Sequence, residues 1–331
     1  MSLIRRGAGA LNDFVDVLKQ VRTDEIAAEA EQHFEIAIVG APGAGKTTLV
    51  NRIAMGGLGG LLEPFGVRRL VELDAPLSPG ELQTAYQANL VVWLQDVTAP
   101  YPDDSFGLLR SHAQAFLNAG NKADLLVNLE AAAERDAVLF SAQSSDSVRS
   151  QLAPAIVGAV PHLGLALGRC FSIFRPAVAE REILRVARVN AEIAVVSAIP
   201  QASLILGPVS AVADTFLLTK NQAILLLRLA ALYGLSLDKR RLLELAPVAG
   251  AAFGWRALAR ELVGFLPAGL GVVPKAAIAY AGTVAVGRSA AWYYETGRKM
   301  PENQLRQIYD ESATRAKALV HDITQRLKRA S

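Results

Sequence analysis

A glycine-rich octapeptide carries the clearest chemistry in this 331-residue chain. It reads Gly40-Ala-Pro-Gly-Ala-Gly-Lys46-Thr47, a complete Walker A phosphate loop. Its glycines let backbone N–H groups point at phosphate oxygens, its lysine supplies positive charge for the β- and γ-phosphates, and its threonine hydroxyl can ligate Mg²⁺. We therefore expect a nucleoside di- or triphosphate to contact Gly40, Ala41, Pro42, Gly43, Ala44, Gly45, Lys46, Thr47 and Thr48.

The segments around this loop are of the kind that such a loop requires. Ile36 to Val39 is a short apolar run typical of a buried strand, and Thr47 to Ile53 predicts a helix whose positive N-terminus faces the phosphates. From about Gln32 to Ser150, strand-like and helix-like segments alternate, which indicates a parallel α/β sheet. The predicted strands are Phe34–Val39, Arg69–Leu73, Leu90–Leu94, Ala115–Asn118 and Ala137–Phe140.

A second motif, Asn121-Lys-Ala-Asp124, follows the apolar pair Phe116-Leu117. At a strand end, the Asp124 carboxylate could accept hydrogen bonds from the N1–H and the 2-amino group of guanine, which adenine cannot supply. Lys122 could then lie over the base, and Asn121 could brace the loop. Three residues, 118–120, separate the apolar pair from this motif, so an accidental match in a surface loop is the alternative.

A third motif lies about twenty residues further along. The strand-like run Ala137 to Phe140 ends in Ser141-Ala142-Gln143. A backbone amide of Ser141 or Ala142 would be able to reach the O6 atom of guanine. The order of the three motifs favours guanine over adenine.

Residues 34–145 resemble the Era/TrmE-type bacterial GTPases, P-loop proteins of the TRAFAC class, through the motifs GAPGAGKT, NKAD and SAQ. The resemblance implies a Ras-like α/β domain that binds GTP or GDP with Mg²⁺. It carries over to Lys46, Thr47, Asn121, Lys122 and Asp124.

The segment between the first two motifs departs from that family. Asp74 ends an apolar run and is the expected metal-side carboxylate, so we predict that Lys46, Thr47 and Asp74 act in catalysis and that Thr47 and Asp74 hold Mg²⁺. The family pattern Asp-x-x-Gly has leucine here at position 77, and no serine or threonine lies between Thr48 and Asp74. No glutamine or histidine follows to orient the attacking water. We therefore expect slow GTP hydrolysis, with a hydrolysis-deficient nucleotide-binding scaffold as the alternative.

An ATPase is the other alternative. Leu77-Ser-Pro-Gly-Glu81 followed by Leu90 to Asp96 is similar to an ABC-type signature that precedes a Walker B strand. The interval from Lys46 is too short for the intervening ABC subdomain, and Val97 stands where a catalytic glutamate would follow. The same segments fit a helix and a strand of a GTPase.

The second half of the chain is helical and apolar in character. Residues 180–300 resemble the C-terminal domain of unknown function of YcjF-type proteins, through Ile199-Pro200, Asn221–Gly234, Arg256–Glu261, Leu266–Gly269, Ala279–Thr283 and Ala285–Gly287. Residues 150–168, 193–213 and 262–274 carry no formal charge. A packed all-α domain and a membrane-embedded or re-entrant domain both fit these runs. We predict an N-terminal amphipathic helix over residues 1–32, a GTPase domain over 33–150, a helical domain over 151–300 and a C-terminal amphipathic helix over 301–331.

Composition restricts the location and the partners. A net charge of +3 gives no argument for specific nucleic-acid binding, and one cysteine excludes a disulfide framework within the chain. Arg5, Arg6 and Asp13 interrupt the first apolar residues, so no secretory signal is expected. We expect a cytoplasmic protein, with association to the inner face of the cell membrane left open, whose helical domain contacts a membrane or a protein partner or forms a homo-oligomer.

Overall fold

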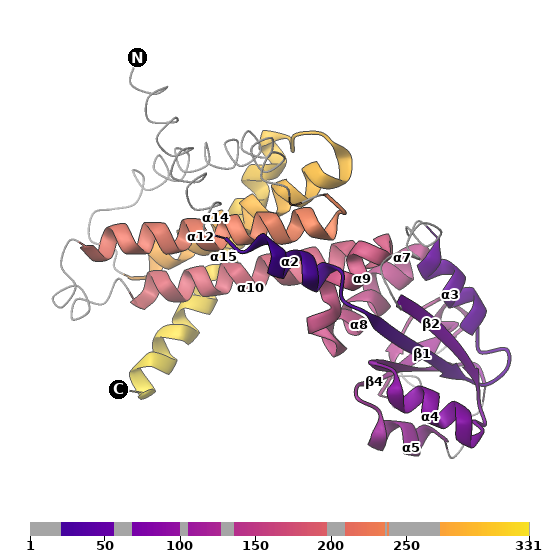
Figure 1. Ribbon diagram of the computed structural model, residues 1–331. Helices are drawn as coiled ribbons and strands as arrows, with labels where there is room; N and C mark the ends of the chain where they lie inside the picture. The colour runs from indigo at the N-terminus through magenta and orange to yellow at the C-terminus, as the bar shows by residue number, and fades with distance from the viewer. Residues whose placement is uncertain are drawn as a thin grey trace. The chain divides into compact units, whose positions relative to one another are not determined.

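The computed structural model describes residues 21–55, 68–99, 105–126, 136–196, 209–235, 237 and 272–330. The chain divides into two compact units, residues 27–178 (the α/β unit) and residues 1–26 with 179–331 (the helical unit) (Figure 1). Helix α2 (Thr23–Ala30) and helix α10 (Arg175–Val196) each run from one unit into the other. The predicted helix before residue 21, the charge-free run over 262–271 and the resemblance at 199–200 and 256–269 lie outside the described residues.

A five-stranded sheet forms the centre of the α/β unit. All four strand pairs are parallel, and the strand order is β2-β1-β3-β4-β5. The prediction of an α/β fold with a parallel sheet is therefore confirmed. The strands are β1 (Phe34–Gly40), β2 (Arg68–Asp74), β3 (Leu90–Asp96), β4 (Phe116–Asn121) and β5 (Val138–Leu139).

Strand β4 is longer than the apolar pattern predicted. The predicted strand ended at Asn118, with residues 118–120 between the apolar pair Phe116-Leu117 and Asn121, but Asn118 to Asn121 pair in register with Trp93 to Asp96 of β3. A parallel neighbour supplies the hydrogen bonds that hold this polar and glycine-containing segment extended, and local propensity does not reveal them. Gly120 fits because a Cβ there would lie 2.7 Å from a methyl carbon of Val97 and 2.8 Å from one of Leu139.

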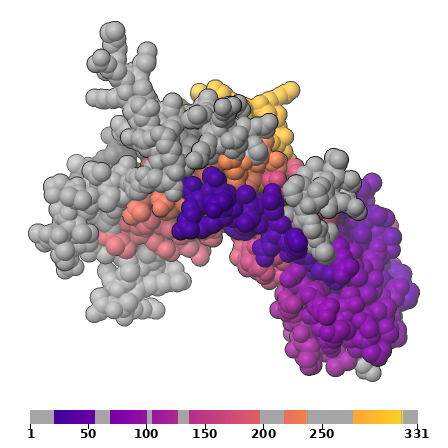
Figure 2. Space-filling view, in the orientation of Figure 1, coloured from indigo at the N-terminus to yellow at the C-terminus, as the bar shows by residue number. Residues whose placement is uncertain are grey.

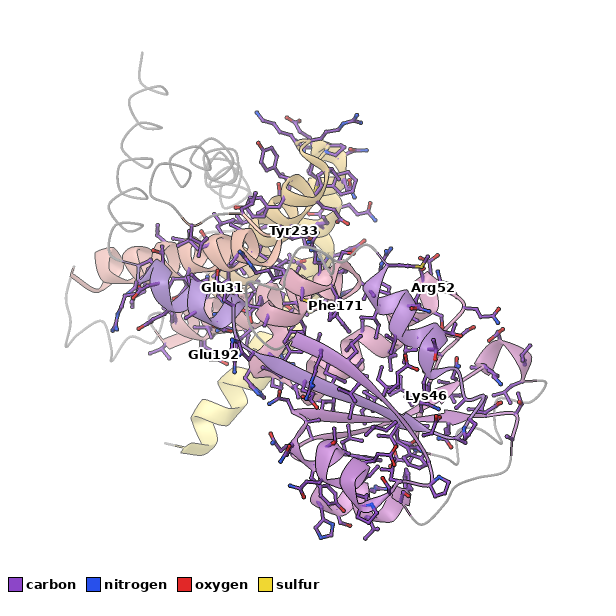
Figure 3. The ribbon with its side chains drawn as sticks, turned by 45° about the vertical axis from the view of Figure 1, so that its right-hand side comes forward. Glu31, Lys46, Arg52, Phe171, Glu192 and Tyr233 are labelled. Carbon is purple, nitrogen blue, oxygen red and sulfur yellow. The ribbon has the colours of Figure 1, made fainter. Side chains whose placement is uncertain are left out.

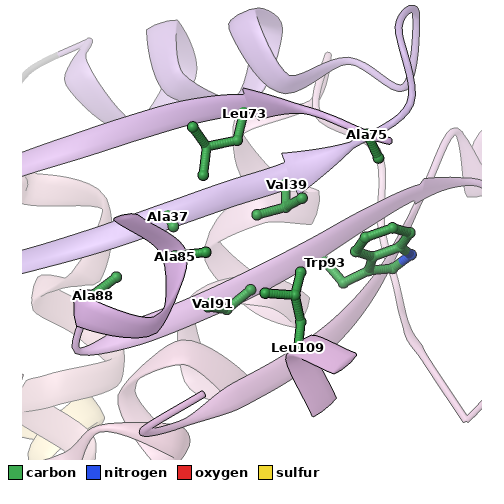
Figure 4. Packing of buried hydrophobic residues seen from close by; sticks show 9 residues of the cluster. All are labelled: Ala37, Val39, Leu73, Ala75, Ala85, Ala88, Val91, Trp93 and Leu109. Carbon is green, nitrogen blue, oxygen red and sulfur yellow. The ribbon is translucent and has the colours of Figure 1, made fainter. Parts of the chain in front are cut away.

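Helices cover both faces of the sheet, and its central strands β1 and β3 are buried along nearly their whole length, as expected for a parallel sheet. On one face, α4 (Pro79–Gln87) and α5 (Ser105–His112) pack against alternate residues of β1, β2 and β3 (Figure 4). Trp93 of that cluster makes an edge-on contact with Phe106 of α5, with 5.5 Å between ring centroids. On the other face lie α3 (Lys46–Ala54), beside β1 and β2, and α8 (Ala153–Ala159), beside β4.

A run of short helices leads from the sheet to α10. These are α7 (Ser145–Ser147), the π-helix η3 (Val148–Leu152), α8, η4 (Pro161–Leu163), α9 (Gly164–Cys170) and η5 (Ser172–Phe174). Most residues of the charge-free run over 150–168 are buried. Figure 2 shows one face of the α/β unit, drawn in indigo to magenta. Within the described residues, no single helix has the length and apolar character to cross a bilayer, whereas Ser145–Ala159 and Pro161–Cys170, bent by 108°, meet that test only as a pair.

The described part of the helical unit consists mainly of α10, α12 (Val209–Leu232), α14 (Val272–Thr296) and α15 (Glu302–Ala330). Helices α10 and α14 approach closely at Gly287, where a Cβ would lie 2.5 Å from a side-chain carbon of Ile183. The fully buried Asn190 of α10 donates a hydrogen bond to Thr283 of α14 at 2.9 Å and accepts one from Asn221 of α12 at 2.8 Å. These polar contacts join three helices at one level of an apolar core.

Candidate nucleotide-binding site

The predicted site residues come together at one edge of the sheet. Gly40, Asp74, Asp96 and Asn121 are the last residues of β1, β2, β3 and β4. Parallel strands end at the same edge, and the strand order places β1 between β2 and β3, where successive connections leave in opposite directions. In open parallel sheets, ligands bind outside the carboxyl ends of the strands at such a switch point.

The conformation of the phosphate loop depends on its glycines. A Cβ on Gly40 would lie 2.1 Å from the Leu94 carbonyl oxygen, so the loop leaves β1 in direct contact with β3. Gly43 and Gly45 have φ angles of +81° and +98°, which an L side chain adopts only with strain. A Cβ on Gly45 would also lie 2.3 Å from the Asn121 side-chain nitrogen. The loop therefore passes directly into α3, which begins at Lys46.

Lys46 is held deep in the loop and is 7% exposed. Its amine donates hydrogen bonds to the carbonyl oxygens of Gly40 and Ala41, both at 2.9 Å, and forms an ion pair with the Asp74 carboxylate at 2.5 Å. The Asp74 side chain is 67% exposed. The lysine charge is thus fixed at the loop, where Figure 3 labels it, while its carboxylate partner remains open to solvent and to added ligands.

Thr47 contacts a residue that sequence reasoning missed. Its hydroxyl donates a 2.6 Å hydrogen bond to the Glu72 carboxylate. Glu72 lies two residues before Asp74 on β2, and the two-residue period of a strand places both carboxylates on one face. That alternation was the available signal. Hydrophobicity alone does not reveal Glu72, because it lies inside the apolar run Leu70 to Leu73.

A cavity of about 430 Å³ lies outside the phosphate loop, and its lining residues are Pro42, Gly43, Gly45, Lys46, Thr47, Thr48, Glu72 and Asp74. In the described part of the chain, no group of three or more His, Cys, Asp or Glu side chains could hold a metal ion. The Thr47 hydroxyl and the two carboxylates fit Mg²⁺, which binds one or two carboxylates and completes its shell with phosphate and water oxygens. The lining therefore suits a metal that arrives with a polyphosphate.

Asn121 connects the three sequence motifs. Its side chain is 3% exposed, donates a 2.8 Å hydrogen bond to the Ala44 carbonyl and accepts one of 2.8 Å from the Ala142 amide. These partners lie 77 and 21 residues away in the sequence. One amide thus ties the phosphate loop to the loop after β5, which includes the buried residues Ser141 and Ala142.

Lys122 and Asp124 follow Asn121 directly. Lys122 has a φ of 66°, and its amine forms an ion pair with the Asp96 carboxylate at 2.5 Å. Burial would raise the pKa of Asp96, but hydrogen bonds from Lys122 and Thr98 outweigh it and lower that pKa. Asp124 is exposed on the 3-10 turn η2 (Ala123–Leu125), and its carboxylate accepts no hydrogen bond from any described residue. It is available to a ligand at the end of β4.

Leu77, which stands where the family pattern has glycine, is built into the fold. Its side chain packs against the core cluster beneath α4, and its amide donates a 3.4 Å hydrogen bond to the Ser105 hydroxyl. Ser78 then caps α4 through a capping box with Glu81. The segment that resembled an ABC signature therefore ends a loop and starts a helix.

Arg52, near the end of α3, is the second residue that sequence reasoning missed. Its guanidinium donates hydrogen bonds to the loop after β5, at Ala142, Gln143 and Ser145. No local pattern marks an arginine for such a contact, because its partners are about ninety residues away.

Comparison with known proteins adds no assignment: no protein-family model matches the chain, and no curated protein matches it. The geometry of the site therefore carries the functional argument.

Proposed function

We propose that the α/β unit is a Ras-like P-loop domain that binds guanine nucleotides with Mg²⁺ and hydrolyses GTP slowly. The observation that carries this proposal is the Asn121 side chain, which holds the phosphate loop and the loop after β5 at once. An accidental Asn-Lys-x-Asp tetrapeptide would have no reason to be buried between two loops so distant in sequence. This arrangement supports a site that binds phosphates at the loop before α3 and a base beside the loop after β5.

Each group has a defined part in this function. Lys46 and the amides of the phosphate loop bind the β- and γ-phosphates, and the Asp74 carboxylate gives up its ion pair with Lys46 when they bind. Thr47, Asp74 and Glu72 would hold Mg²⁺, which neutralises phosphate charge when bound. Asp124 accepts the N1–H and the 2-amino group of guanine, and Lys122 lies over the base after releasing Asp96.

Slow turnover is supported by the segment after β2. A backbone amide that reports on the γ-phosphate must be free to rearrange. The amide of Leu77 is instead bonded to Ser105, and its side chain is packed in the core. The same observation favours the second proposal, a scaffold that holds nucleotide without hydrolysing it. The partner of the helical unit, whether a membrane or a protein, stays a prediction.

A competition titration tests the proposal. Purified protein is loaded with fluorescent GDP, and GTP, GDP and ATP are added separately with Mg²⁺ and again with EDTA. We expect displacement by GTP and GDP but not by ATP, and loss of binding in Lys46→Ala, with the exposed Lys299→Ala as control. Displacement by ATP at equal concentration would contradict guanine recognition. GTP turnover that disappears in Lys46→Ala would favour the enzyme, and tight binding without turnover would favour the scaffold.

A further inference from the structure

Strand β2 forms one edge of the sheet, and no strand among the described residues pairs with its outer side (Figure 1). All seven of its residues pair with β1 on the inner side. An exposed strand of this length presents a row of backbone donors and acceptors that can pair with a further strand. The opposite edge, β5, has only two residues and contacts η3. The edge at β2 is therefore the one suited to pairing.

The alternation of a parallel ladder shows which backbone groups of β2 point outward. The N–H of Ala75, directly after β2, donates to the Gly40 carbonyl of β1 at 3.1 Å. Every second residue of a strand bonds to the same neighbour, so the odd-numbered residues of β2 also bond to β1. The N–H and C=O groups of the even-numbered residues, Leu70 and Glu72 at the centre, then point away from β1. No described residue supplies a partner for these outward groups.

The charges of β2 are arranged so that the strand complements a second copy of itself. Its sequence, Arg-Arg-Leu-Val-Glu-Leu-Asp, is basic at its start and acidic at its end. A two-fold axis brings the same edge of two copies together with their strands antiparallel. The basic start of each strand then meets the acidic end of the other, and opposite charges on facing residues stabilise such a pair.

Backbone geometry restricts the register of this pairing. Residues with outward backbone groups must lie opposite each other, because they exchange the hydrogen bonds. The register centred on Val71 meets this condition and is the one that pairs all seven residues. It sets Arg68 opposite Asp74 of the second copy. The Asp74 side chain is 67% exposed, so its carboxylate can meet an arginine from outside its own chain.

We propose that two copies of this chain pair antiparallel through the outer edges of β2, in the register centred on Val71. The two sheets then continue into one another across a two-fold axis. The proposal does not rest on the guanine binding proposed above, since the backbone groups and the charges of β2 carry it. The two can therefore fail independently.

Cysteine crosslinking tests the surface and the register together. The single native cysteine, Cys170, is buried and is replaced by alanine in all variants. In the proposed pair, Val71 lies opposite Val71 of the second copy at a non-hydrogen-bonded position. The Cα atoms at such a position are about 4.5 Å apart, which is within the range of a disulfide. Arg69 and its copy are displaced by four residues, or about 14 Å along the strands, and serve as the matched control.

The control is stringent because Arg69 is more exposed than Val71, so random collisions would favour crosslinking at Arg69. Under mild oxidation, Val71→Cys should form a covalent dimer on a non-reducing gel at least about tenfold faster than Arg69→Cys. Equal crosslinking of the two variants, or none in either, would overturn the proposal.

Sedimentation velocity of the full chain tests the surface without an added thiol. Wild type should dimerise. Leu70→Pro should be monomeric, because proline removes an outward N–H that makes no bond to β1, whereas Leu70→Ala keeps this N–H and should dimerise. Arg68→Glu should weaken the dimer by roughly tenfold, because two pairs of opposite charges become pairs of like charges.

Two results would overturn the proposal. One is a Leu70→Pro variant that dimerises as well as Leu70→Ala, since the dimer would then use another surface. The other is a monomeric wild type, which would leave the edge of β2 to a strand of a different protein. If Leu70→Pro fails to fold by circular dichroism, the dimer affinity of Arg68→Glu decides in the same way.

Discussion

Replacing Gly45 by alanine should damage the site more than the same change at Gly43, and the difference measures the Asn121 bridge. Both glycines have positive φ, so alanine costs about 1–2 kcal/mol at either position. A Cβ on Gly43 meets no atom within 4 Å, whereas a Cβ on Gly45 would lie 2.3 Å from the Asn121 side-chain nitrogen. Gly43→Ala is therefore a matched control for backbone strain.

The extra cost follows from the partners of Asn121. That side chain is buried, so moving it would leave the Ala44 carbonyl and the Ala142 amide without their partner. Each unpaired buried group costs about 1–3 kcal/mol. Gly45→Ala should therefore be roughly 2–4 kcal/mol less stable than Gly43→Ala, after allowance for partial relaxation of the loop.

Urea unfolding of the α/β unit measures this difference. Trp93 lies on β3 in the core of that unit and is 3% exposed, and the chain has three tryptophans. In a Trp255→Phe, Trp292→Phe background, fluorescence reports on Trp93 and therefore on this unit, which avoids treating a two-unit protein as one transition. Equal free energies of unfolding for the two alanine variants would refute the view that Asn121 holds the loops together.

Further predictions concern the helical unit and the metal. Burial would raise the pKa of Glu182, but hydrogen bonds and charge from Arg228, with Arg185, outweigh it and lower that pKa below 4.5. The ionised Glu182 side chain therefore stabilises the fold above about pH 4.5, and this stabilisation is lost as the pH falls through the lower pKa of the folded state. Acid unfolding followed by circular dichroism should show this loss of stability. In Glu182→Gln, the corresponding pH dependence should be absent. Gly287→Ala should destabilise the helical unit by about 1–3 kcal/mol, because the added methyl group would overlap the Ile183 side chain. The fluorescence of Trp292 during urea unfolding measures this change. An unchanged free energy of unfolding would mean that α10 and α14 can move apart at no cost. Glu72→Gln should narrow, by several-fold, the gap between the affinity for GDP in Mg²⁺ and the affinity for GDP in EDTA. The Glu72 carboxylate would hold Mg²⁺ when the metal is present and repel phosphate when it is absent, so the substitution acts in opposite directions in the two conditions. An unchanged gap would place Glu72 outside the metal site.

Much of the fold could be predicted because residues close together in the sequence determine it. Apolar runs mark the strands, the phosphate loop marks the first turn, and the alternation with helices indicates a parallel sheet. The end of β4 could not be predicted, because its extension depends on pairing with β3 and not on the preferences of Asn118 or Gly120. Local signals predict elements, and long-range pairing sets where they stop.

The same distinction applies to the site. Lys46 and Thr47 are fixed by their own loop and were predicted. Glu72 could have been found from its alternation with Asp74 along β2, whereas Arg52 acts through partners about 90 residues away, so no local pattern identifies it. Asn121 was predicted as a brace, but the sequence does not identify its two partners, because they lie 77 and 21 residues away.

The most direct test of guanine recognition is a titration of wild type and Asp124→Asn with GDP and xanthosine diphosphate in Mg²⁺. Xanthine has a carbonyl where guanine has its 2-amino group, so an asparagine amide can donate where the aspartate accepts. Wild type should prefer GDP and Asp124→Asn should prefer xanthosine diphosphate, with the ratio of affinities changing by on the order of 100-fold. An unchanged ratio would contradict the role of Asp124 and, with it, the assignment of the base.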